Sequence, residues 1–145
     1  MTPKIDGMYR SMHSVYLLQY HIVIVTKYRN PVLQGDVKEN VYKTIRDTLD
    51  MFGCTLKEMN GEADHVHLLI ETPPDIKLNT LIQTLKIRSA RFARRDYPEE
   101  VAKFYWKNYF WNNGYFISTV SENTLSNVET YIKNQGMKSK NRICD

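Results

Sequence analysis

The sequence predicts an α+β fold, in which an antiparallel sheet carries two helices on one face and a further helix follows at the C-terminal end. Segments rich in β-branched and aromatic residues alternate with segments whose apolar residues recur at helical spacing. The 145 residues suffice for one domain with a real core. Since no internal repeat or linker divides the chain, residues 1–145 are interpreted as a single domain.

The first half of the chain contains one predicted strand and one predicted helix. Residues 1–14 are interpreted as a loose lead-in. Residues 15–26 are rich in β-branched and aromatic side chains, which predicts a long strand, and its apolar middle indicates cover on both faces. Residues 32–52 carry Val37, Val41, Ile45 and Leu49 at helical spacing, and Gly53 is expected to end that helix.

The second half begins with two short strands, residues 54–59 and 63–71. The pair Asn60-Gly61 between them is a strong hairpin signal. The following elements are a break at residues 72–75, a helix over 76–97 that ends before Pro98, one or two strands within 104–120 divided near 112–114, and a helix over 125–135 that stops at Gly136.

The resulting order is β-α-β-β-α-β-α. Without the last helix this is the ferredoxin-like, or RRM-like, plan, in which both helices cover one face of the sheet. The opposite face is then expected to be open for a site.

Composition restricts the classes of function. The chain is 42% hydrophobic and 25% charged, as is ordinary for a soluble protein, and no apolar run could span a bilayer. No secretory signal precedes the domain, so cytoplasmic residence is expected, with association to the nucleoid when the protein acts. The spacing of Cys54 and Cys144 does not suit a metal, which favours a reduced, incidental role.

The charge distribution favours contact with nucleic acid. The net charge is +4 and the pI about 9.0, which permits such contact without proving it. Two segments hold many bases and few acids, although a solvated helix face would look the same. They contain Lys86, Arg88, Arg91, Arg94 and Arg95, and Lys133, Lys138, Lys140 and Arg142.

A first candidate motif is His65-Val66-His67, within the predicted strand over 63–71. Side chains alternate along a strand, so the two histidines share one face, about 7 Å apart, and the neighbouring hydrophobes face the helices. Such a pair makes half of a metal site. The alternative is two half-buried histidines that make ordinary hydrogen bonds.

A second candidate motif is Tyr131 with Gln135, four residues apart in the last predicted helix. This spacing puts both on one helix face, which offers a nucleophile beside a possible metal ligand. The alternative is a core aromatic and a surface residue. With ten tyrosines in the chain, spacing alone does not single out a catalytic one.

Together the motifs resemble those of the small single-tyrosine transposases of the HUH (His-hydrophobe-His) superfamily, which move insertion sequences as single-stranded DNA. The resemblance runs through almost the whole chain. Its pieces are Tyr20-His21-Ile22-Val23 with Thr26-Lys27-Tyr28-Arg29, Asp64-His65-Val66-His67-Leu68-Leu69, Leu81-Ile82-Gln83-Thr84-Leu85-Lys86 with Ser89, Trp111 and Tyr115-Phe116 before Thr119-Val120, and Tyr131-Ile132-Lys133-Asn134-Gln135. Ile87 departs from the family pattern, which often has Gly there.

The resemblance implies a site and a reaction. His65, His67 and Gln135 would bind a divalent metal, Mg²⁺ or Mn²⁺, and Tyr131 would attack DNA to form a 5′-phosphotyrosine and release a 3′-OH. The enzyme would work as a homodimer on single-stranded DNA with hairpin ends. The resemblance also makes Lys86, Arg88 and Arg91 candidates for phosphate contact.

Other functions remain open on the sequence alone. A related tyrosine nuclease acting on chromosomal repeat hairpins would use the same His65, His67 and Tyr131. A hydrolase that uses water would not need Tyr131. A non-enzymatic module for single-stranded nucleic acid would place aromatic residues on its central strands, where this sequence offers two histidines instead.

Overall fold

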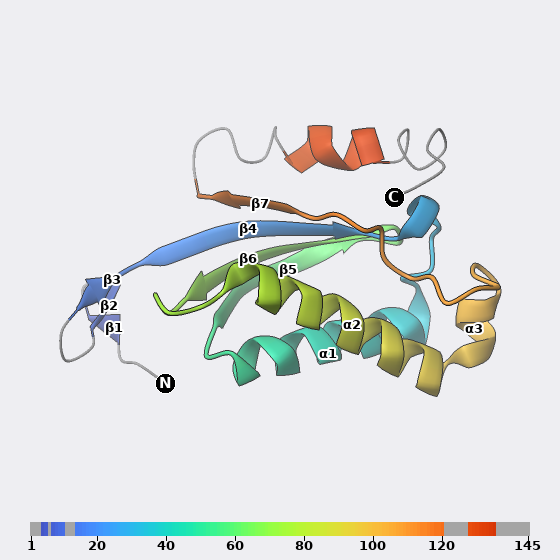
Figure 1. Cartoon of the computed structure of the whole chain (residues 1–145), viewed down its shortest axis with the longest axis horizontal. Helices are drawn as coiled ribbons and strands as arrows, with labels where there is room; N and C mark the ends of the chain where they lie inside the picture. Colours follow the sequence, from blue (N-terminus) through green and yellow to red (C-terminus); the bar gives the residue numbers. More distant parts are fainter. Residues whose placement is uncertain (1–3, 6, 11–13, 121–127, 136–145) are drawn as a thin grey trace.

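The computed structural model describes residues 4–5, 7–10, 14–120 and 128–135. Its main sheet has four antiparallel strands in the order β5-β6-β4-β7. The helices α1 and α2 cover one face, and the C-terminal helix, residues 128–135, lies over the other (Figure 1). The bounds are β4 Leu18–Val25, β5 Thr55–Glu62, β6 His65–Thr72, β7 Phe116–Thr119, α1 Gly35–Met51 and α2 Leu78–Asp96. This arrangement confirms the predicted fold class.

The core lies between the sheet and the two long helices. Ile22 and Ile24 of β4 face it, as do Val66, Leu68 and Ile70 of β6, and all five are fully buried. The other face of β4 is also apolar, since Val23 and Val25 are buried against Val128. The prediction that β4 is covered on both sides is therefore confirmed. The sheet face expected to be open is partly closed by the C-terminal helix.

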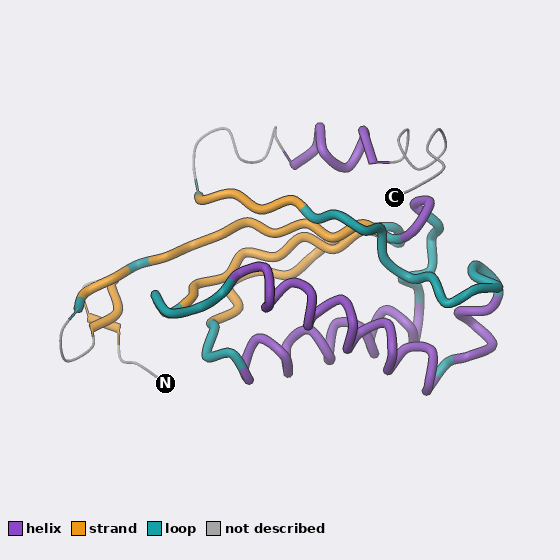
Figure 2. The backbone as a smooth tube through the Cα atoms, in the orientation of Figure 1, coloured by secondary structure: helices purple, strands orange, loops and turns teal. Residues whose placement is uncertain are grey.

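The interpretation of residues 1–14 as a loose lead-in is wrong for the part that the structure describes. Three short strands, β1 (Lys4–Ile5), β2 (Met8–Arg10) and β3 (Val15–Tyr16), form a separate antiparallel sheet (Figure 2). Buried Glu71 ties this sheet to β6, because it accepts hydrogen bonds from Tyr9 Oη at 2.6 Å and Lys4 Nζ at 2.9 Å. The segment predicted as one long strand over 15–26 therefore contains two strands, β3 in this small sheet and β4 in the main sheet.

The hairpin turn lies later than predicted. Asn60 and Gly61 sit inside β5, paired with His67 and Val66, and the turn is made by residues 63–64. A side chain on Gly61 would overlap the backbone of His65. Glycine is therefore needed here for a close approach of two strands, whereas the prediction assigned it to a turn.

The region 104–120 forms only one regular strand, β7. The residues before it make an aromatic loop that places Tyr105, Phe110 and Trp111 in the core. This loop is joined to the end of β4, because Asn112 N donates to Val25 O at 2.8 Å. Of the one or two strands predicted here, the structure has one, which begins after residues 112–114, and Trp111 before them makes only an isolated bridge to Thr26. Pro98 ends α2 as predicted and also begins the short helix α3 (Pro98–Ala102).

The last predicted helix is present over residues 128–135. Its expected start at Leu125 and stop at Gly136 lie outside the described residues, as do Cys144 and the basic residues after 135. Cys54 is buried and has a free thiol. Among the helices that the structure describes, none has both the length and the apolar character required to cross a membrane.

Candidate active site

The histidines of β6 lie on the face of the sheet opposite α1 and α2. His65 pairs with Val25, and His67 with Val23. Directly paired residues of an antiparallel sheet point to the same face, so both imidazoles share the face on which the C-terminal helix lies. The structure therefore brings His65 and His67 to one face, as the alternation in the sequence predicts.

A third histidine, which the sequence analysis did not assign to the site, accompanies His67. A hydrogen bond joins His21 Nδ1 and His67 Nε2 at 2.8 Å, and the two rings stack with centroids 5.0 Å apart. Burial lowers the pKa of both His21 and His67. Their neutral forms are thereby favoured, and a metal requires a neutral imidazole. The pairing of β4 with β6, which no local sequence pattern reveals, creates this contact.

His65 has a carboxylate partner in the β5–β6 turn. Its Nδ1 lies 2.8 Å from Asp64 Oδ1, and Asp64 Oδ2 accepts a hydrogen bond from Arg29 Nε at 2.9 Å. Burial raises the pKa of Asp64, but these hydrogen bonds outweigh burial and hold that pKa below its ordinary value. Possible ligand atoms of Glu62, Asp64 and His65 lie within 4.8 Å of one another, the one such group of three among the described residues.

The C-terminal helix is amphipathic over its eight described residues. Residues 128, 131, 132 and 135 turn toward the sheet, and residues 129, 130, 133 and 134 are exposed. Tyr131 packs against Phe116 of β7, with ring centroids 5.5 Å apart, and its hydroxyl lies beside Gly114. Burial raises the pKa of Tyr131 to about 12. Its phenol is thus protonated at neutral pH.

The amide of Gln135 is engaged with the loop that precedes β7. Asn112 Nδ2 donates to Gln135 Oε1 at 2.5 Å, and both side chains are buried. The structure thus brings Tyr131 and Gln135 together beside β7. His65 and His67 lie on β6, beyond β4, and neighbouring strands are about 4.8 Å apart. The four predicted site residues accordingly share one face of the sheet.

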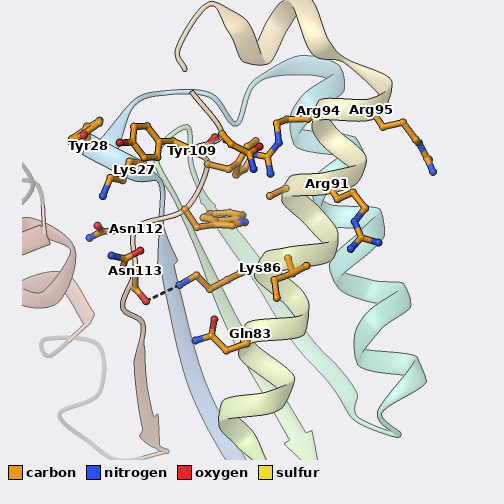
Figure 3. Close-up of a pocket in the computed structure, with 15 residues that line it drawn as sticks. Lys27, Tyr28, Gln83, Lys86, Arg91, Arg94, Arg95, Tyr109, Asn112 and Asn113 are labelled. Atoms are coloured by element: carbon orange, nitrogen blue, oxygen red, sulfur yellow. Dashed lines mark hydrogen bonds between the residues drawn. The ribbon is translucent and has the colours of Figure 1, made fainter. Parts of the chain in front are cut away.

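A basic cavity lies on the other side of β7, between α2 and the aromatic loop (Figure 3). Its volume is about 980 Å³. It is lined by the cations Lys27, Lys86, Arg91, Arg94 and Arg95 and the aromatic residues Tyr28, Tyr109, Phe110 and Trp111. Positive charge and aromatic rings together suit an anionic ligand with planar groups, such as a nucleic acid.

The structure separates the three predicted DNA-binding residues. Lys86 and Arg91 line the cavity, whereas Arg88 donates to Thr48 Oγ1 on α1 at 3.0 Å and does not line it. Lys86 Nζ donates to the carbonyls of Asn113 and Gly114 at 3.0 and 3.2 Å. Burial lowers the pKa of Lys86 to about 8. Lys27 and Arg94, which were not proposed as DNA ligands, also line the cavity.

Comparison with known families supports a relation to transposases. The family model described as "Transposase IS200 like" matches residues 14–135. The chain is similar to the ISDra2 transposase TnpA of Deinococcus radiodurans, with 37% identity over 121 residues, covering 83% of this chain and 86% of the relative. It is also similar to the transposase for insertion sequence element IS200 of Salmonella typhimurium, with 31% identity over 124 residues, covering 85% of this chain and 80% of the relative.

Solved structures give the same result for the fold. The crystal structure of a transposase from Deinococcus radiodurans matches with a TM-score of 0.82 and 33% identity, covering 88% of this chain and 98% of that one. A REP-associated tyrosine transposase bound to a REP hairpin matches with a TM-score of 0.55 and 12% identity, covering 89% of this chain and 74% of that one. At that identity the second match shows the fold alone.

Proposed function

The chain belongs to the family of IS200-like transposases, and on this premise we propose that it cleaves and rejoins single-stranded DNA at insertion-sequence ends through a 5′-phosphotyrosine. The observation that carries the proposal is the shared sheet face, which holds the two histidines of β6 and the tyrosine helix. A non-enzymatic nucleic-acid module would not need this combination.

Tyr131 is the proposed nucleophile. Its phenolic oxygen would form a bond to the scissile phosphorus while the bond from phosphorus to the 3′ oxygen breaks, and the 3′ oxygen leaves as a hydroxyl after gaining a proton. With a pKa near 12, the phenol must lose its proton during the attack. Since the phosphotyrosine is itself a phosphodiester, a 3′-OH from another strand can reverse the step without ATP.

The residues present fit a divalent ion such as Mg²⁺ or Mn²⁺. His65 and His67 offer imidazoles, Gln135 offers an amide oxygen, and carboxylates lie next to His65. Two imidazoles and one amide oxygen would leave positions for water or phosphate, which suits these ions better than it suits a closed structural zinc ion with four protein ligands. A bound ion would supply Lewis acidity and orientation for the scissile phosphate. Gln135 would have to exchange its hydrogen bond with Asn112 for this role.

We propose further that the enzyme acts as a homodimer. In the described structure Tyr131 packs on Phe116 of β7, and Val128 of the same helix packs on β4, the strand paired with β6. A second copy of the chain could bring its tyrosine helix to the histidines of β6. A mixture of Tyr131→Phe with the double variant His65→Ala, His67→Ala tests this directly. Covalent DNA adduct formed only by the mixture supports action between subunits, and an inactive mixture of demonstrated heterodimers contradicts it.

The basic cavity is the proposed binding surface for the DNA. Arg91, Arg94 and Lys27 would contact phosphates, and Tyr28 and Tyr109 offer rings against which unpaired bases can stack. We retain Lys86 and Arg88 in the proposed DNA-binding set. Lys86 would support DNA binding partly by holding residues 113–114 at the cavity wall. Arg88 would contact a phosphate from the side of α2 that faces α1.

An assay for a covalent adduct tests the proposed function. Labelled single-stranded DNA carrying the element's ends would be incubated with wild type or Tyr131→Phe and with Mg²⁺ or Mn²⁺, and the products would be examined by denaturing gel and mass analysis. We expect a metal-dependent adduct with wild type and none with Tyr131→Phe. Tyr115→Phe is a matched control, because the Tyr115 hydroxyl donates to Asn79 outside the site. Cleavage by Tyr131→Phe would mean a water nucleophile.

A second candidate function would use the same site residues. The fold resembles that of the REP-associated tyrosine transposase, which was solved with a REP hairpin. A tyrosine nuclease acting on chromosomal repeat hairpins would also require His65, His67 and Tyr131. Adduct formed with repeat hairpins but not with insertion-sequence ends would favour this alternative.

A further inference from the structure

Asp64, in the turn between β5 and β6, is held from both sides. Each carboxylate oxygen has a partner, since Oδ1 lies 2.8 Å from His65 Nδ1 and Oδ2 accepts from Arg29 Nε at 2.9 Å. Its side chain is 15% exposed. The backbone carbonyl of Asp64 accepts two further hydrogen bonds from Thr26, from N at 2.9 Å and from Oγ1 at 3.1 Å. Both its backbone and its carboxylate are therefore fixed in position.

The turn that presents Arg29 is built in an uncommon backbone conformation. Tyr28 and Arg29 have φ values of 59° and 55°, in the left-handed region that residues with a Cβ rarely adopt. Surrounding contacts stabilise this turn, because Tyr105 Oη donates to Lys27 O at 2.6 Å and Asn30 Nδ2 donates to Phe104 O at 3.1 Å. A strained conformation that its surroundings hold is a common feature of functional sites.

We infer that Asp64, itself held by Arg29, is a positioning residue that fixes which nitrogen of His65 faces the metal. An ionised carboxylate only accepts hydrogen bonds, so its neighbour Nδ1 must carry the proton of the neutral ring. The lone pair of His65 is then on Nε2, the nitrogen that remains available for an ion. This inference rests on the metal-dependent reaction proposed above and adds two residues, Asp64 and Arg29, to its machinery.

The geometry also defines the competing explanation. Ligand atoms of Glu62, Asp64 and His65 lie within 4.8 Å of one another, so both carboxylates could bind an ion directly. In that case Glu62 and Asp64 would contribute alike. As a positioning residue, Asp64 acts through its hydrogen bond to His65, and Glu62 is not required. The Glu62→Gln variant is therefore the matched control, since it removes a nearby charge and leaves the Asp64–His65 contact intact.

The first measurement is the tautomer of His65, from the ring nitrogen shifts of ¹⁵N-labelled full-length protein without metal. We expect the Nδ1-protonated form in wild type and in Glu62→Gln. In Asp64→Ala we expect a shift toward the Nε2-protonated form. Asp64→Asn retains an acceptor oxygen and should lie between them. An unchanged His65 tautomer in a folded Asp64→Ala protein overturns the inference, with folding checked by circular dichroism.

The second measurement is the affinity for Mn²⁺ by calorimetry. Loss of a carboxylate that orients a ligating histidine weakens metal binding about 10- to 100-fold. We therefore expect the Kd for Mn²⁺ to rise by that factor in Asp64→Ala. A smaller rise in the same direction is expected for Arg29→Ala, which loosens Asp64 without touching His65, and none for Glu62→Gln. Equal losses in Glu62→Gln and Asp64→Ala would assign both carboxylates as direct ligands and overturn the positioning role.

The two measurements also separate this inference from the proposed function. Absence of Mn²⁺ binding by wild type would overturn the metal assignment and, with it, the role of Asp64. If wild type binds Mn²⁺ and forms the DNA adduct while Asp64→Ala binds with the same Kd, the proposed function stands and only the inference fails.

Discussion

Replacement of Val128 by Asp should detach the tyrosine helix from the sheet while leaving the rest of the fold intact. This helix is amphipathic over its eight described residues, and in proteins most helical stability comes from the packing of such a face. It is therefore held mainly by its buried side. Val128 is 4% exposed and packs against Val23 and Val25, which are 0% and 1% exposed. The new carboxylate would meet two buried valines.

The expected loss can be estimated from this burial. Burial of a valine side chain contributes about 1.5–3 kcal/mol, all of which the substitution removes. A carboxylate placed against apolar groups without a partner adds at least about 2 kcal/mol. The total is about 4 kcal/mol, and since 1.4 kcal/mol is a factor of ten, the docking equilibrium should fall by roughly a thousandfold. The protection of the helix amides against exchange should fall by about the same factor.

Hydrogen–deuterium exchange by mass spectrometry measures this change. In Val128→Asp the amides of residues 128–135 should lose protection, while those of β4 and β6 keep theirs, and formation of the Tyr131 adduct should be lost. Asn134→Asp is the matched control, because it adds the same charge on the exposed side of the same helix. Unchanged protection in Val128→Asp, or an equal loss in Asn134→Asp, would refute the idea that Val128 holds the helix.

Three further predictions concern stability, measured by urea or thermal denaturation. Hydrogen bonds hold the pKa of buried Glu71 at about 2, below its ordinary 4.5, despite burial, which raises it. Its contribution of up to about 3 kcal/mol is present above pH 4.5 and is lost as the pH falls toward 2, so wild type and Glu71→Gln should differ near neutral pH and converge in acid. Burial lowers the pKa of Lys86 from 10.5 to about 8. As the pH rises, Lys86 therefore loses its proton at a lower pH in the folded state than in the unfolded state. The stability of wild type relative to Lys86→Met should therefore rise between these pH values, and a pH-independent difference would contradict this. Gly61→Ala should cost about 1–3 kcal/mol, because its side chain meets the His65 backbone, and an unchanged melting temperature would contradict that.

The sequence was sufficient for the features that depend on local period. Alternation along residues 63–71 placed His65 and His67 on one face and the core residues on the other, and helical spacing put Tyr131 and Gln135 on one side of their helix. These patterns survive in the structure because each requires only one element and one buried face. The fold class followed from the order of these elements along the chain.

Most of the missed features depend on contacts between distant segments. His21 reaches His67 only through the pairing of β4 with β6, and Arg29 reaches Asp64 only through two consecutive left-handed residues. The N-terminal strands have too few residues to show a period, and they are fixed by hydrogen bonds to Glu71. Gly61 was misassigned because glycine in a turn and glycine at a close strand contact look alike in sequence.

The two halves of the candidate site are held by different means. The histidines belong to β6, which pairs with β5 on one side and with the buried strand β4 on the other, and Asp64 and His21 provide their hydrogen-bond partners. Tyr131 and Gln135 belong to the C-terminal helix, whose described residues are held by the apolar contacts of Val128, Tyr131 and Ile132 and by a hydrogen bond from Asn112 to Gln135. Local stability is lowest where few buried contacts exist, so the helix can leave the sheet at a free energy well below that of global unfolding. Metal binding by the two histidines should therefore persist in Val128→Asp, weakened by the loss of Gln135, while attack by the tyrosine is lost.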